Sequence, residues 1–358
     1  MRLAYPLTFF ANMSIALSSM IIPLLAEDLD ISYFYLGLVV MAYGIASSLS
    51  YFLFGRLSDS FGKRVVFVRV GFAAGFLTFL FQVLMHDWGS MMVVRSLAGF
   101  SVGISSFPLL AYLSEFSGYE GRVWVYSGFG SLGWFVGYMG AGVIPSYDPV
   151  FILAALMFLL GFLLSLRMHE VRGARRKLSP SWDIVKKNYA VYFSYLLRHT
   201  GAYCVWTIFP LYLIELGATR FWVGVIYSLN CVLQFFVMSS LGRLGRKLDE
   251  RFLIRVGLLL SSLVFLGYSL ATSYLQIVPI QVMLAFAWST LYVGSLLYLL
   301  ARNVEKATST GILGSTISLA GVVGPFVGGT ISELFGLRAV MYVAFVLTAL
   351  ATILSGKA

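Results

Sequence analysis

Long apolar runs separated by short polar connections fill the whole chain. A membrane-spanning helix needs about 20 mostly apolar residues, and twelve stretches of this sequence reach that length. Because the connections are short, neighbouring helices are predicted to run antiparallel, with no soluble domain between them. The predicted spans are residues 4–26, 34–55, 65–85, 90–114, 122–145, 149–168, 189–214, 221–241, 252–271, 274–300, 307–332 and 337–355.

The composition excludes an ordinary water-soluble domain. Of the 358 residues, 59% are hydrophobic and 11% are charged, whereas a soluble domain carries about 25% charged residues. A net charge of +10 would suggest nucleic acid for a soluble protein. Here the charges lie in short runs between apolar segments, which indicates membrane topology and lipid headgroups rather than nucleic acid. Cys204 and Cys231 lie in apolar stretches without metal-binding spacing, so no metal site is predicted.

The positive charges alternate between the two sides of the predicted membrane. Arg95 and Arg198 fall inside spans, and Arg220 and Arg338 fall on odd-numbered connections. The other lysines and arginines lie on even-numbered connections, their flanking helix ends or the two termini. The excess of positive charge on cytoplasmic loops therefore predicts a multi-pass plasma-membrane protein with both termini in the cytoplasm.

The two halves of the chain resemble each other. A shift of 187 positions places Pro23 on Pro210, Gly37 on Gly224 and Arg64 on Arg251. The sequence predicts a six-helix half over residues 1–168, a basic cytoplasmic linker over 169–188, and a second six-helix half over 189–358. The linker is interpreted as a solvated loop that touches anionic lipid, and a regulatory site there is the alternative.

The connection after the second span carries the most specific motif, Gly55-Arg56-Leu57-Ser58-Asp59-Ser60-Phe61-Gly62-Lys63-Arg64. Gly55 lets two helices approach closely, and Gly62 allows a turn with unusual dihedral angles. Asp59 is a charge at a helix end, and Arg122 could be its partner. The corresponding segment of the second half keeps Gly242 and Arg243 but has Arg246 in place of the acid.

This connection resembles the signature loop of the major facilitator superfamily, in which Asp59 and the basic pair Lys63 and Arg64 match the pattern. The resemblance implies an all-α membrane fold of about twelve helices in two pseudo-symmetric halves. It also implies that the loop acts as a cytoplasmic latch, and that the protein is a secondary transporter without a cofactor.

Glycine motifs in three spans agree with this resemblance. The fourth span carries Arg95-x-x-x-Gly99-x-x-x-Gly103, and the fifth carries Gly133-x-x-x-Gly137, which is similar to the glycine motif of antiporters in the superfamily. Tyr138 stands where that motif has proline. The eleventh span fits the motif better, through Gly324, Pro325 and Gly328. Such small-residue spacings promote close helix packing in any membrane protein.

Ionisable and amide side chains inside a membrane are costly, which makes them functional candidates. The resemblance implies that the first, fourth, seventh and tenth helices line the substrate cavity, and the strongest buried polar positions fall on these helices. Tyr195 shares a helical face with His199, which favours His199 over Arg198 as the residue facing the cavity. Helix packing or gating is the alternative role for Arg95. For the aromatic residues the alternative is core packing or a belt at the membrane interface. The predicted cavity residues are Asn12, Arg95, Tyr195, Arg198, His199, Gln281 and Trp288.

No Asp or Glu is predicted at mid-membrane, so a transported proton would use His199, the candidate proton site, or an acid at the end of a helix. The motifs resemble those of drug-efflux permeases, which predicts a monomer that exports a small amphipathic solute by alternating access, coupled to a proton or another ion. The buried Arg198 and Arg95 leave uptake or exchange of an organic anion open. A non-transporting sensor or partner subunit is a further alternative. An enzyme is not expected, because no paired acid, nucleophile or metal cluster accompanies Arg198 and His199.

Overall fold

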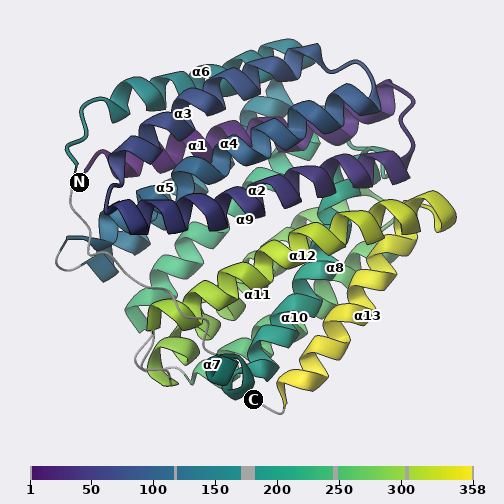
Figure 1. Ribbon diagram of the computed structural model, residues 1–358. Coiled ribbons are helices and arrows are strands. Elements are labelled where there is room, and N and C mark those ends of the chain that lie inside the picture. Colours follow the sequence, from purple (N-terminus) through teal and green to yellow (C-terminus); the bar gives the residue numbers. More distant parts are fainter. Residues whose placement is uncertain (1, 117–118, 171–181, 245–248, 303–305, 357–358) are drawn as a thin grey trace. The chain divides into compact units, whose positions relative to one another are not determined.

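The computed structural model describes residues 2–116, 119–170, 182–244, 249–302 and 306–356, and this part of the chain is helical (Figure 1). Twelve long helices match the twelve predicted spans. A six-residue helix, α7, lies in the predicted linker and was not foreseen. The helices are α1 Ala4–Asp28, α2 Tyr33–Phe61, α3 Val65–Leu80, the 3-10 turn η1 Phe81–Leu84, α4 Trp88–Ser114, α5 Tyr119–Val143, α6 Tyr147–Ser165, α7 Trp182–Lys187, α8 Tyr189–Glu215, α9 Arg220–Leu244, α10 Glu250–Leu270, α11 Tyr274–Arg302, α12 Lys306–Phe335 and α13 Leu337–Ser355.

Ten of the described helices are long and apolar enough to cross a membrane. Between its ends a helix satisfies its backbone hydrogen bonds internally, which is what a bilayer core without water demands. The other two long helices, α5 and α8, have 25 and 27 residues and are therefore long enough to span. Most of α8 is buried against protein, so its polar and aromatic residues need not face lipid. The prediction of an all-α membrane protein of about twelve long helices is confirmed.

The first compact unit comprises residues 1–31, 42–178 and 220–228. In it, α1 packs against α5 and α6, and α3 packs against α4 and α6. Aromatic rings fill the contact between α3 and α6, where Phe79 lies 4.7 Å from Phe158 between ring centroids.

The second compact unit comprises residues 32–41, 179–219 and 229–358. In it, α8 packs against α12 and α13, and α10 packs against α11 and α13. These are the same pairings as in the first unit, helix for helix, when α1 is matched with α8 and α3 with α10. The sequence repeat therefore corresponds to a repeat of helix packing.

Each unit also contains the first turns of one helix from the other half of the sequence. In the second unit, Gly37 of α2 meets Gly329 of α12, and a Cβ atom added to Gly37 would lie 3.0 Å from the Cα of Gly329. In the first unit, Gly224 of α9 meets Gly142 of α5 at 2.9 Å by the same measure. Both pairs are related by the 187-residue shift, and only glycine permits so close an approach of two helix backbones.

Side chains from neighbouring elements close two helix ends in the first unit. The Glu170 carboxylate accepts hydrogen bonds from the first backbone N–H groups of α3, including that of Val65 at 3.0 Å. In the opposite direction, Arg69 of α3 donates to the carbonyl oxygens that end α6, including Met168 at 2.8 Å. The two interactions satisfy backbone groups that a helix leaves unpaired at its ends. They fasten α3 and α6 to each other at one end.

Candidate functional site

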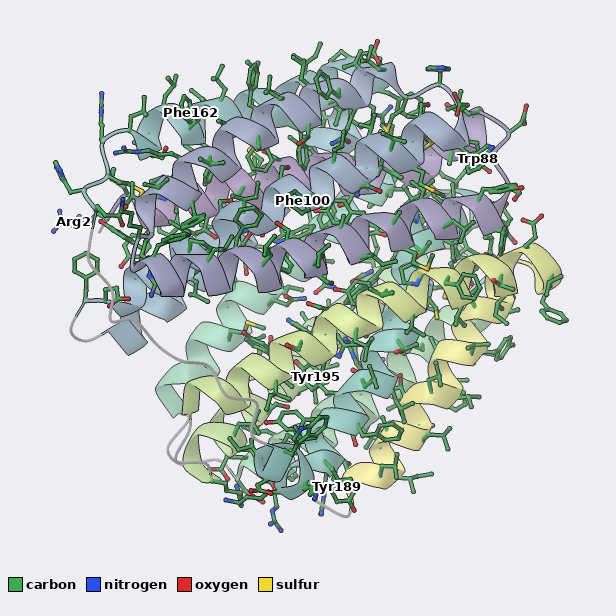
Figure 2. The ribbon with its side chains drawn as sticks, viewed as in Figure 1. Arg2, Trp88, Phe100, Phe162, Tyr189 and Tyr195 are labelled. Carbon is green, nitrogen blue, oxygen red and sulfur yellow. The ribbon has the colours of Figure 1, made fainter. Side chains whose placement is uncertain are left out.

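The buried face of α8 brings three of the predicted site residues together. Tyr195, Arg198 and His199 are spaced three and four positions apart, so they lie within one turn of the helix. All three are buried, and Arg198 and His199 have no exposed surface. Tyr195 is labelled in Figure 2 among the helices of the second unit. The sequence favoured His199 alone as the cavity-facing residue; in the structure both side chains are enclosed.

Aromatic rings surround this group. The rings of Tyr195 and His199 stack at 4.3 Å between centroids, and the rings of His199 and of Trp288 on α11 form a T-shaped pair at 5.0 Å. Trp288 stacks in turn on Tyr292 at 5.5 Å. Together, Tyr195, His199, Trp288 and Tyr292 form a continuous aromatic cluster between α8 and α11.

The guanidinium of Arg198 lies beside this cluster. Its Nε donates to the hydroxyl of Ser261 on α10 at 3.2 Å, and its Nη1 lies 3.4 Å from Nε2 of His199. Its Cζ lies 5.1 Å from the centre of the Trp288 ring, a distance at which a cation is attracted to the ring face. Ser261 was missed from the sequence because serine is common in these helices and nothing marks one as a partner.

Hydrogen bonding fixes the protonation of His199. Its Nδ1 lies 2.9 Å from the carbonyl oxygen of Tyr195, an acceptor, so Nδ1 carries the proton. Its Nε2 faces an Arg198 N–H, a donor, so Nε2 presents its lone pair. His199 is therefore a neutral imidazole in this arrangement.

A second buried arginine lies in the first unit. Nη1 of Arg95 donates to the hydroxyl of Ser18 at 2.8 Å, and Ser18 donates to the side-chain oxygen of Gln82. The guanidinium also lies 4.2 Å from the centre of the Tyr43 ring. The amide of Gln82 in an apolar run was the signal that sequence reasoning passed over.

The remaining predicted cavity residues, Asn12 and Gln281, lie on α1 and α11. Asn12 donates to Thr8, one turn earlier on α1, at 2.8 Å. Gln281 of α11 is buried, and its side-chain oxygen has no partner among the described residues. The structure thus groups Tyr195, Arg198, His199 and Trp288, and places Asn12 and Arg95 in the other unit.

The predicted gating loop forms a network around Arg64. Gly62 has a φ of 61°, in the left-handed region that favours glycine. The hydroxyl of Ser58 donates to the carbonyl of Lys63 at 2.7 Å and accepts from Arg64 at 2.9 Å. Arg64 also forms an ion pair with Glu115 at 3.1 Å, a partner that the sequence did not identify.

Three of the residues predicted for the gating loop cannot be placed in this network. Gly55 and the predicted pair of Asp59 and Arg122 lie outside the side chains that the structure describes. The interaction between Asp59 and Arg122 therefore stays a prediction.

The predicted packing glycines lie at close helix contacts. A Cβ added to Gly99 would lie 2.5 Å from the Tyr43 carbonyl oxygen, and one added to Gly137 would lie 2.6 Å from that of Met13. On α12, a Cβ added to Gly328 would lie 2.6 Å from the carbonyl oxygen of Cys204. The other positions with backbone or side-chain atoms closely opposed are Gly103, Gly133 and Gly324, and the Pro325 carbonyl opposes Gly37.

Comparison with known proteins identifies the family. The sequence profile of the Major Facilitator Superfamily matches residues 4–310 and 191–356. The chain belongs to the Major Facilitator Superfamily. Members of this superfamily are integral membrane transporters that bind small-molecule substrates, so this chain is a plasma-membrane transporter and not an enzyme.

Relatives within the Major Facilitator Superfamily cover most of the chain. A multi-drug resistance efflux pump, PmrA of Streptococcus pneumoniae, is 25% identical over 96% of this chain and 91% of its own length. The proton-coupled antiporter flippase LtaA of Staphylococcus saprophyticus is 21% identical over 83% of this chain and 78% of its own. Among solved structures, a mutant of the nucleoside transporter NupG gives a TM-score of 0.78 at 13% identity, covering 99% of this chain and 98% of that one. The human organic anion transporter MFSD10 gives 0.74 at 16% identity, with 99% and 98% coverage. At these identities the structural matches establish the superfamily fold alone.

Proposed function

We propose that this transporter exports small amphipathic organic solutes by alternating access. The observation that carries the proposal is the match to a multi-drug resistance efflux pump over 96% of the chain. The large aromatic rings beside Arg198 support it, because such rings offer apolar contact area to solutes of varied shape. The protein is further proposed to act as a monomer. Its positive charges predict that both termini lie in the cytoplasm.

Export is tested in a bacterial strain that lacks its main drug exporters. Cells are loaded with an anionic, a cationic or a neutral fluorescent amphiphile: carboxyfluorescein, ethidium or Nile red. Expression of the transporter should lower the steady-state accumulation of at least one dye several-fold, and a protonophore should abolish this difference if export is proton-coupled.

Two variants control the assay. Gly62→Val should abolish export, because a β-branched residue does not tolerate the left-handed backbone at this position. Gly314→Ala should leave export intact, because nothing lies within 4 Å of a Cβ added there. Equal accumulation with and without the transporter, for all three dyes, would contradict export.

The second candidate function is uptake or exchange of an organic anion. The buried Arg198 and Arg95, neither of which forms an ion pair among the described residues, favour this function. A rise rather than a fall in carboxyfluorescein on expression would replace the export proposal with uptake.

A further inference from the structure

Arg198 is fully buried, and the described side chains that contact it carry no negative charge. Its neighbours are the hydroxyl of Ser261, the neutral ring of His199 and the face of Trp288. Within the described part of the chain it forms no ion pair, and its Nη2 has no hydrogen-bond partner. A buried guanidinium that keeps its charge without an acid is costly in free energy. A ligand that supplied the missing negative charge would therefore bind favourably there.

Three other arginines of the chain have partners for their guanidinium groups. Arg64 is almost as buried as Arg198 and pairs with Glu115 at 3.1 Å. Arg302 pairs with Glu250 at 3.4 Å. Arg95 forms no such pair among the described residues, but its guanidinium is covered by the Tyr43 ring at 4.2 Å and anchored by Ser18. Among these four arginines, Arg198 is the one with a buried terminal nitrogen that has no hydrogen-bond partner in the described residues; outside the four, Nη2 of Arg220 is another such atom.

Two aromatic rings beside Arg198 remain partly exposed. Its Cζ lies 5.1 Å from the ring centre of Trp288 and 5.9 Å from that of Trp206. Both tryptophans keep part of their surface accessible, whereas the arginine keeps none. The accessible surface of these rings therefore lies beside the guanidinium, which a ligand contacts once the side chains that cover Arg198 move aside.

We propose that Arg198 binds a planar or tetrahedral oxyanion, a carboxylate or phosphate, carried by the transported solute, and that Trp206 and Trp288 contact the apolar part of the same molecule. The proposal rests on the proposed transport function and names its substrate class. Arginine suits this ligand because its rigid fork donates two parallel hydrogen bonds to such a group. Ser261 and His199 position the guanidinium by holding Nε and Nη1.

The test measures binding by isothermal titration calorimetry of the whole protein in nanodiscs of neutral phosphatidylcholine. The probes are indole-3-acetate, phenyl phosphate and the uncharged analogue indole-3-acetamide. The wild type should bind at least one of the two oxyanions about 10- to 100-fold more tightly than the uncharged analogue, which is the expected effect of a charge-assisted hydrogen bond. Oxyanion affinity no greater than that of indole-3-acetamide would overturn the proposal.

Variants separate a binding role from a structural one. Arg198→Gln should remove the preference for oxyanions, whereas Arg198→Lys keeps the charge without the fork and should retain part of it. Arg338→Gln is the matched control, because this arginine of the same unit donates to the Ala271 carbonyl at 3.0 Å, near the ends of α10 and α13. If Arg198→Gln does not fold, Arg198→Lys decides: oxyanion affinities equal to those of the wild type in a folded Arg198→Lys protein would overturn the proposal.

Two further arms identify the source of the anion and separate the two proposals. Nanodiscs with phosphatidylglycerol should leave the affinity for the soluble probes intact; competition by this lipid that Arg198→Gln abolishes would assign the oxyanion to a headgroup. Export of ethidium that is unchanged in Arg198→Gln, together with absent anion binding, would overturn this inference and leave the export proposal standing. Anion binding that depends on Arg198, in a protein that exports none of the dyes, would overturn the export proposal and leave this inference standing.

Discussion

Gly133 is a residue at which α5 comes very close to α1. A Cβ added there would collide with the Phe9 carbonyl oxygen and would lie 3.0 Å from the Met13 nitrogen, both of them backbone atoms that cannot rotate away. Gly133→Val should therefore force the two helices apart and cost about 1–3 kcal/mol of stability. The measurement is the thermal unfolding midpoint of the protein purified in detergent.

The same experiment has a control within the chain. Gly314 of α12 has open space around it, so Gly314→Ala should leave the midpoint unchanged or raise it by removing backbone freedom, worth about 0.5–1 kcal/mol. Equal midpoints for Gly133→Val and wild type would contradict this prediction, because they would show that α1 and α5 can move apart without loss of stability.

At the residue scale, the sequence predicts the charged and aromatic members of the Arg198 cluster but not its hydroxyl member. Arg198 and His199 are conspicuous because ionisable groups are rare in apolar spans. Ser261 belongs to a class of residue that occurs in many of the spans, and only the three-dimensional structure shows which serine of α10 meets Arg198 of α8. For the same reason the sequence could not choose Glu115 as the partner of Arg64.

At the scale of the elements, the contact between the ends of α3 and α6 should contribute measurably to the stability of the protein. Glu170→Ala removes the carboxylate that accepts the first N–H groups of α3, including those of Arg64 and Val65. Loss of a helix cap of this kind costs about 1 kcal/mol, and the thermal midpoint should fall.

Glu170→Gln distinguishes hydrogen bonding from charge. The amide keeps one acceptor oxygen but loses the negative charge that favours a helix N-terminus, so its midpoint should lie between those of wild type and Glu170→Ala. A midpoint for Glu170→Ala equal to that of wild type would contradict a capping role for this carboxylate.

Most helices could be predicted because each span is a long run of mostly apolar residues. The elements that the sequence did not predict are short. Residues 182–187 form α7 within a polar, basic segment, where six residues give no periodic pattern. The end of the third span tightens into the η1 turn at Phe81–Leu84, a change in hydrogen bonding that apolar composition does not reveal.

For the whole molecule, the repeat makes a prediction about equivalent positions. Gly37 and Gly224 are related by the 187-residue shift, and each meets a glycine of α12 or α5 in the same way. Gly37→Val and Gly224→Val should therefore lower the thermal midpoint by similar amounts, several degrees each. A large drop for one variant and none for the other would show that the two contacts are not equivalent in energy.

The sequence predicts the repeat but not where these helix starts pack. A shift of 187 positions matches residues with residues, yet it does not say which helix a glycine touches. That information is tertiary, and it assigns the first turns of α2 and α9 to the unit built mostly from the other half of the sequence.

This exchange of helix starts bears on how the protein can be made. A fragment that ends before the linker would carry Gly142 without Gly224, and the remaining fragment would carry Gly329 without Gly37. Each fragment would expose one glycine surface that only the other fragment fills. We therefore expect the two fragments of a chain cut in its linker to associate when they are expressed together, because each presents a glycine surface that matches one on the other.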